Sequence, residues 1–287
     1  MKFLNKEKMR EHLKNFLTVV MYGVIFYFVF TSISSFFDKS SKSEAKSKDC
    51  NVANIKVYGH IASYSKQFSI QDPLNEGDKV NISTSDTASA DDIIKSIAEA
   101  NDDKNIKALL ITINSPGGTP VAGEDIADAI KHSPKPTVAL IRDIGASAAY
   151  WVASGANTIF ASKNSDVGSI GVTQSYLDDT EKNTIEGLKY IDLSIGKYKD
   201  TGAPGKPLTE EEKKLLFRDI EIVYQNFVQA VSENRNIPFE KVGILADGST
   251  MLGEMALQNG LIDKIGGIYE VKDYLREKIG EDVKLCE

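Results

Sequence analysis

One serine, Ser147, lies in a run of glycine and alanine between two segments with different apolar patterns. Residues 137–141 (TVALI) form a short apolar run typical of a buried strand, and residues 147–154 have the spacing of a helix. A serine on such a tight strand-to-helix turn can attack a carbonyl carbon if a base is near. The same small residues would also suit a helix that packs closely on a sheet, and this segment alone leaves both interpretations open.

A second turn of this kind ends the preceding apolar run, residues 108–114. Its sequence is INSPGG, Ile113–Gly118, and a segment with helical spacing follows it. Acyl transfer places negative charge on a carbonyl oxygen, which backbone N–H groups at such a turn can stabilise. Glycine lets the main chain come close to a ligand, and the N–H of Ala148 is a candidate for a second donor. A plain strand-to-helix turn is the alternative.

A serine nucleophile requires a base, and histidine is the usual one. The chain has three histidines, His12, His60 and His132. His12 lies before the apolar N-terminal segment described below, and His132 lies at the end of a predicted helix, away from the strand ends that carry Ser147. His60 lies in a predicted first strand and stays open as a base.

A lysine can replace histidine when its amine is kept neutral. Its pKa must then fall from about 10.4, which desolvation can achieve. The candidates are Lys197 and Lys199 in SIGKYKDTGAP, because they follow a predicted strand and precede a loop with glycine and proline. Most lysines are solvated surface residues, so the local sequence does not choose between them.

Apolar runs that alternate with helical spacing predict the elements that position these residues. The alternation indicates an α/β fold of stacked βαβ units around a parallel sheet whose strands are covered on both faces. A T-x-x-E capping box at Thr209 and Glu212 predicts the start of the longest helix, which we expect to serve packing. Residues 71–90 are expected to be a loop. The expected strands are 55–61, 108–114, 137–141, 157–162 and 188–195, and the expected helices are 90–101, 121–131, 147–154 and 208–235.

Composition limits the function further. The 287-residue chain has a net charge of −7, which argues against a nucleic-acid partner. Two cysteines, Cys50 and Cys286, have no metal-ligand spacing, so no metal is expected. They could be bridged in an oxidising compartment or remain two free thiols.

The N-terminal region predicts a membrane anchor. Residues 16–37 carry no charge over 22 residues, which is enough for a helix to cross a bilayer. We therefore divide the chain into a cytoplasmic leader (1–15), a transmembrane anchor (16–37), a Ser/Lys-rich flexible tether (38–54) and a folded domain (55–287). Lysines and arginines flank the anchor on both sides, so the orientation follows only weakly from charge. A cleaved signal peptide is the alternative.

Five motifs, in order, resemble the signal peptide peptidase A family: INSPGG, GASAAYWVAS, SDVGSIGV, GKYKDTGAP and LADGSTMLGEMALQNGLIDKIGG. The resemblance covers residues 55–268. It implies a membrane-anchored serine protease with a crotonase/Clp-like fold, acting outside the cytoplasm on remnant signal peptides. Where the family usually has DGR, this sequence has DGS, with Ser249 in place of arginine.

The resemblance also implies roles for single residues. Ser147 would be the nucleophile, Lys199 rather than Lys197 the general base, and Ser169 the hydroxyl that hydrogen-bonds the lysine. Gly118 and Ala148 would donate to the oxyanion. No cofactor is implied. A homo-oligomer whose serine and lysine can come from neighbouring subunits is implied as well.

Two other functions stay open at this point. One is acyl-CoA chemistry on the same fold, in which the glycines would polarise a thioester. The other is an anchored assembly that holds peptides or partner proteins without cutting them. CoA binding would favour the first, and failure of Ser147 to react with a fluorophosphonate probe would favour the second.

Overall fold

The computed structural model describes Met21, residues 50–64, 67–71 and 79–83, and residues 87–286. Apart from Met21, the predicted leader and anchor lie outside these residues, as does most of the predicted tether. Within the described ranges, no helix has the length and apolar character needed to cross a membrane.

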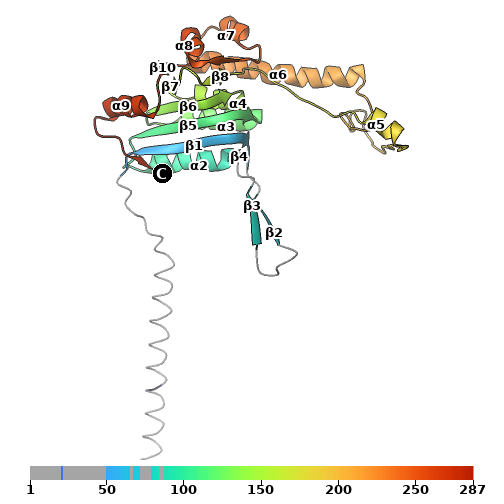
Figure 1. Ribbon diagram of the computed structural model, residues 1–287, viewed down its shortest axis with the longest axis horizontal. Coiled ribbons are helices and arrows are strands. Elements are labelled where there is room, and N and C mark those ends of the chain that lie inside the picture. Colours follow the sequence, from blue (N-terminus) through green and yellow to red (C-terminus); the bar gives the residue numbers. More distant parts are fainter. Residues whose placement is uncertain (1–20, 22–49, 65–66, 72–78, 84–86, 287) are drawn as a thin grey trace, which may run out of the picture. The chain divides into compact units, whose positions relative to one another are not determined.

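The centre of the fold is a mixed sheet with the order β10-β7-β6-β5-β1-β11. All neighbours along this path are parallel, and β8 and β9 form the one antiparallel pair of this sheet among the described residues. Figure 1 shows β1, β5 and β6 side by side. The strands of this sheet are β1 (Val52–Ala62), β4 (Thr87–Ser89), β5 (Ala108–Gly118), β6 (Thr137–Ala146), β7 (Thr158–Ala161), β8 (Asp166–Gly168), β9 (Thr250–Leu252), β10 (Lys264–Ile265) and β11 (Leu285–Cys286). A separate hairpin pairs β2 (Gln67–Gln71) with β3 (Lys79–Ser83).

Helices connect the parallel strands and cover both faces of the sheet (Figure 1). Successive residues of a strand point to opposite faces. Leu109 and Ile111 of β5 therefore pack with helices α2 to α4 and α6, whereas Ala108 and Leu110 pack with α9. The near-continuous apolar run of this strand thus follows from burial on both sides. The helices are α2 (Ala90–Asp102), α3 (Pro120–Lys131), α4 (Ala148–Ser154), α5 (Thr180–Ile185), α6 (Glu210–Arg235), α7 (Phe239–Leu245), α8 (Gly253–Asn259) and α9 (Ile268–Ile279).

The predicted βαβ alternation is confirmed, and so is the capping box of α6. The Thr209 side chain accepts a hydrogen bond from the N–H of Glu212, and the Glu212 carboxylate accepts one from the N–H of Thr209. Only the C-terminal part of α6 packs on the sheet layers, through Phe227, Val228 and Val231. The segment that contains Lys199 precedes the N-terminal end of this helix.

Two predictions of local structure are wrong. Residues 188–195 are not a strand. No described strand pairs with them, and their side chains are exposed, Leu193 to 92% and Ile195 to 99%. The predicted loop at 71–90 contains β3 and β4. With three residues, β4 is too short to show the alternation of apolar and polar residues that predicts a strand. The compact unit also begins at Cys50, so the last residues assigned to the tether belong to it.

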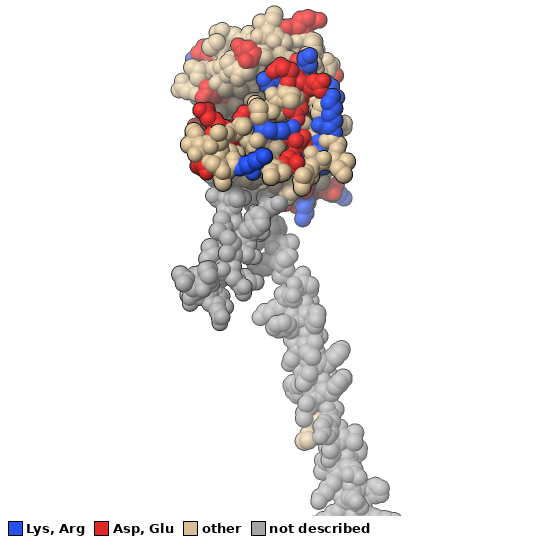
Figure 2. All heavy atoms as spheres, turned by 90° about the vertical axis from the view of Figure 1, so that its right-hand side faces the viewer, with Lys and Arg blue, Asp and Glu red and all other residues tan. Residues whose placement is uncertain are grey.

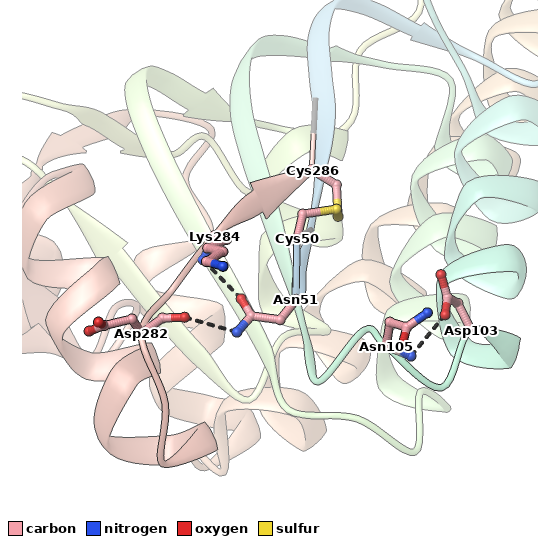
Figure 3. The surroundings of a disulfide bond; sticks show 7 residues. All are labelled: Cys50, Asn51, Asp103, Asn105, Asp282, Lys284 and Cys286. Carbon is pink, nitrogen blue, oxygen red and sulfur yellow. Dashed lines mark hydrogen bonds between the residues drawn. A yellow bond between two sulfur atoms is a disulfide. The ribbon is translucent and has the colours of Figure 1, made fainter. Parts of the chain in front are cut away.

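A disulfide joins the two ends of this unit (Figure 3). Cys50 precedes β1 and is bonded to Cys286 in β11, 236 residues later. Beside it, the side-chain amide of Asn51 donates to the carbonyl of Asp282 and its oxygen accepts from the N–H of Lys284, at 2.9 Å each. The disulfide thus holds the first strand and the C-terminal strand together, and the Asn51 side chain adds two hydrogen bonds to the backbone just before β11.

We expect Cys50→Ser to lower stability without lowering catalysis. Removing a native bridge costs about 2–4 kcal/mol, mainly by freeing the unfolded chain. The bridge lies at the Val52 end of β1, whereas Ser147 lies near the opposite end, where Ile61 pairs with Gly118. Thermal unfolding with and without dithiothreitol tests this. The reductant should lower the Tm of the wild type but not of the variant, and an equal response of both would show that the bond is not formed.

Candidate active site

Ser147 occupies the turn between β6 and α4 in a strained conformation. Its φ is +54° and its ψ is −128°, which is rare for a residue with a side chain. The turn is held by hydrogen bonds from the N–H of Ser147 to the carbonyl of Gly168 (2.8 Å) and from the N–H of Tyr150 to the carbonyl of Ser147 (2.8 Å). The Ser147 hydroxyl has no hydrogen-bond partner in the part of the chain that is described. Strain of this kind is concentrated at functional sites.

The neighbouring small residues serve packing. Ala149 and Ala153 are buried in the core, and Gly123 of α3 lies against Ala148, where a Cβ atom would come within 3.0 Å of the alanine side chain. The close-packing interpretation of the segment is therefore correct for its alanines. Ser147 differs from them in its backbone geometry and in its half-buried side chain.

The SPGG turn lies directly against Ser147. Gly117 has a φ of +109°, and a Cβ atom there would come within 2.8 Å of the Ser147 Cβ. Only glycine fits both the angle and the space. Ser115 holds the turn, because its hydroxyl donates to the carbonyl of Gly59 and accepts from the N–H of Gly117 at 3.1 Å. The two turns that the sequence singled out are thus adjacent.

A cavity of about 520 Å³ opens beside Ser147. Gly118, Ala148 and Ser169 line it together with Ser147, so the structure brings four of the five predicted site residues to one cavity. Ser169 also has a positive φ, +50°, and its hydroxyl donates to the carbonyl of Gly248 at 2.9 Å.

One wall of the cavity is apolar, and sequence reasoning missed most of it. Trp151 and Phe227 stack with their ring centroids 4.7 Å apart. Val223 and Tyr224 of α6 line the cavity beside them, and the Tyr224 hydroxyl donates to the carbonyl of Ala246 at 3.0 Å. The prediction that α6 only packs was therefore too narrow. The apolar stripe of the helix gave no sign that part of it would face a cavity.

Among the described residues, Asp247 is the one acidic residue that lines this cavity. Its carboxylate accepts hydrogen bonds from the Ser249 hydroxyl (2.6 Å) and the Ser249 N–H (2.9 Å), and both lower the pKa of Asp247. Ser249 stands where the resemblance would place an arginine. The serine satisfies the carboxylate locally, so the DGS turn is well formed without that arginine.

Lys199 is the predicted site residue that this single chain does not bring to the cavity. It is exposed, does not line the cavity, and its amine has no hydrogen bond or ion pair with any described residue. Lys197 differs, since it forms an ion pair with Glu211 at 2.7 Å. Hydrogen bonding to Glu211, with a further contribution from Tyr198, raises the pKa of Lys197 and keeps it charged.

Neither of the two described histidines lines the cavity beside Ser147. His60 pairs in the sheet with Gly117, yet its side chain is exposed and lies on the opposite face of β1 from the buried Ile61. His132 ends α3, one helix length away from the SPGG turn, and its Nδ1 contacts the carbonyl of Asp128 at 2.8 Å. His12 lies outside the described residues.

Lys199 follows a segment, residues 174–198, that we call the arm. Helix α5 within it has no buried residue. Figure 2 views the end of the unit that carries α5 and the start of α6, where acidic and basic side chains are interspersed with uncharged ones. The arm exposes large apolar side chains, which in soluble proteins mark an interaction surface. They are Tyr176, Leu177, Ile185, Leu188, Tyr190, Ile191, Leu193, Ile195 and Tyr198.

Comparison with known families identifies two matches. The model of peptidase family S49 matches residues 129–282, which include Ser147, Ser169 and Lys199. The model of the Clp protease family matches residues 64–168, in agreement with the α/β architecture.

Three relatives show how far the similarity extends. A candidate protease of Methanocaldococcus jannaschii is 37% identical over 166 residues, which cover 57% of this chain and 53% of that protein. A candidate signal peptide peptidase SppA of Enterococcus faecium is 26% identical over 251 residues, covering 86% and 71%. The chloroplastic serine protease SPPA of Arabidopsis thaliana is 33% identical over 182 residues, covering 62% and 27%. This chain thus spans about half of the archaeal protein and about a quarter of the plant protein.

Proposed function

The chain belongs to peptidase family S49, and from that premise we propose that it is a serine endopeptidase that cuts apolar peptides with Ser147 as nucleophile and Lys199 as base. The observation that carries the proposal is the geometry of Ser147. Ser147 lies on a strained turn, it lines a cavity, and its hydroxyl has no hydrogen-bond partner among the described residues. Gly117 of the SPGG turn at the end of β5 lies next to it.

The reaction would proceed through an acyl-enzyme. The Ser147 hydroxyl oxygen attacks the substrate carbonyl carbon while the neutral amine of Lys199 takes its proton, and the ammonium then gives that proton to the leaving amine as the C–N bond breaks. Water attacks the ester in the second half, with the same lysine as base. The N–H groups of Gly118 and Ala148 would stabilise the oxyanion, and Ser169 would hydrogen-bond the amine.

We propose that Lys199 acts on Ser147 of a second copy of the chain. Two observations support this. Within one chain no described lysine or histidine lines the cavity beside Ser147, and the arm that precedes Lys199 exposes apolar side chains that a second copy would cover. An amine acts as a base near neutral pH only when it is desolvated, and contact between copies would provide that desolvation.

The cavity supports apolar peptides as the substrate class. Its aromatic wall of Trp151, Tyr224 and Phe227 would take an apolar side chain next to the cut bond. Remnant signal peptides have such side chains along their central segment, and we propose them as the natural substrates.

We place this activity on the extracytoplasmic side of a membrane. The Cys50–Cys286 disulfide supports an oxidising compartment. The predicted anchor at 16–37 would hold the domain at the membrane surface, next to peptides released into the bilayer.

Cleavage of paired peptides tests the substrate class. The full chain in detergent is incubated with a signal-peptide sequence and with a copy whose apolar centre is replaced by serine, and the products are identified by mass spectrometry. We expect cuts within the apolar centre and cleavage of the polar copy that is at least about tenfold slower. Equal cleavage of both peptides, or CoA binding with no cleavage of either, would contradict the proposal.

A further inference from the structure

A buried carboxylate contacts the loop that contains Lys199. Glu212 is the third residue of α6, and only 4% of its side chain is exposed. Its Oε1 accepts from the Lys206 Nζ at 2.8 Å and from the Thr201 hydroxyl at 3.3 Å. Its Oε2 accepts from the N–H and the hydroxyl of Thr209, at 2.9 Å each. These contacts, with Lys206 as the largest cause, lower the pKa of Glu212 to about 2, so the group is charged whenever a lysine base could work.

The same network reaches the residue that follows Lys199. Lys206 also binds the Oδ2 of Asp200, the residue after Lys199, at 2.9 Å. Lys197, two residues before Lys199, forms a separate and exposed ion pair with Glu211. The N–H of Lys199 donates to the carbonyl of Gly196 at 3.1 Å, which closes the turn. Asp200 is thus linked through Lys206 to Glu212 in the first turn of α6, while the Lys199 amine is unpaired in the described part of the chain.

A helix cap alone does not require this arrangement. The capping box needs only Thr209 and Glu212, and the link from Lys206 to Asp200 adds nothing to it. Exposed ion pairs contribute little, but here the shared carboxylate is buried and accepts four hydrogen bonds. The arm before Lys199 has almost no buried side chain to hold it. Apart from the hydrogen bond from the N–H of Asp179 to the carbonyl of Pro204, at 2.8 Å, we therefore expect the backbone of the Lys199 loop to depend on these contacts.

We propose that Glu212 is a positioning residue for Lys199 and acts through Lys206 and Asp200. It fixes the loop at 196–209 so that the amine is presented to Ser147 in the geometry that proton transfer requires. This inference rests on the proposed function of Lys199. A displacement of about 1 Å at a reacting group can lower the rate about 100-fold, so a loosened loop should lower kcat while leaving peptide binding intact.

The test compares three variants of the full chain in detergent with the wild type and with Lys199→Ala. Glu212→Gln keeps the size of the side chain and an acceptor for Thr209 but removes the charge that holds Lys206. Asp200→Asn cuts the link outside the helix and leaves the cap intact. Glu210→Gln is the matched control, because Glu210 lies in the same turn and pairs only with Lys213 of its own helix, at 2.9 Å. For each variant kcat, KM, the pH of half-maximal kcat and the assembly mass are measured.

We expect Glu212→Gln and Asp200→Asn to lower kcat by about tenfold or more, with KM and assembly mass within twofold of the wild type. The pH of half-maximal kcat should rise, because a loosely held amine is better solvated. Glu210→Gln should stay within twofold in kcat. The inference would be overturned if Glu212→Gln and Asp200→Asn both kept the wild-type kcat, or if the control lost as much kcat as they did. It would also be overturned if both test variants lost kcat only to the extent that they lost assembly mass. Full activity of Lys199→Ala would instead overturn the proposed function, whatever Glu212 does.

Discussion

Ser147→Ala is expected to reduce peptide cleavage by on the order of 10⁴-fold or more, because no other described hydroxyl combines a free side chain with this turn geometry. The fold should persist, since alanine meets the same backbone strain as serine. Peptide turnover and thermal unfolding, measured on the full chain, check both statements. Substantial residual cleavage by the variant would remove Ser147 from the mechanism.

Ser154→Ala is the matched control for this variant. Ser154 is buried at the end of α4, where its hydroxyl donates to the carbonyl of Trp151 at 2.6 Å and accepts from the side-chain amide of Asn234 at 3.1 Å. Its loss should cost about 1–3 kcal/mol of stability, because the Asn234 amide loses its acceptor, and should leave kcat of the folded enzyme unchanged. A parallel loss of activity in both serine variants would mean that helix α4, rather than the Ser147 hydroxyl, is being tested.

Lys199→Ala is expected to lower kcat by about 10²–10⁴-fold, the usual cost of losing a general base. Lys199→Arg should be equally inactive, because arginine keeps the charge but cannot give up its proton. Lys197→Ala, two residues away, is the control and should stay close to the wild type, since Lys197 is engaged by Glu211. Activity in Lys199→Arg would show that the position supplies charge instead of taking a proton.

The central fold could be predicted from the sequence because its signals are local. The apolar runs of β5 and β6 and the helices between them follow from burial on both faces of the sheet. The Thr209–Glu212 motif marked the start of α6 within two residues. Ser147 and the SPGG turn could be singled out because small residues follow two successive apolar runs, although each segment alone fitted close packing equally well.

The rest depends on contacts between distant residues or between chains. Residues 188–195 have the composition of a strand, but within one chain they find no partner and stay exposed. The aromatic wall of the cavity joins Trp151 to Phe227, 76 positions later, and no periodicity indicates that pairing. In the proposed mechanism, the position of Lys199 relative to Ser147 is of the same kind, because it would depend on a surface that one copy cannot complete.

Mixing the two inactive variants tests this shared site most directly. Ser147→Ala and Lys199→Ala chains are dissociated, combined in equal amounts and reassembled, and peptide cleavage is compared with that of each variant reassembled alone. If every site takes its serine from one copy and its lysine from the next, random mixing restores about a quarter of the wild-type activity. If both residues come from the same chain, the mixture stays as inactive as its components, and that result would contradict the account.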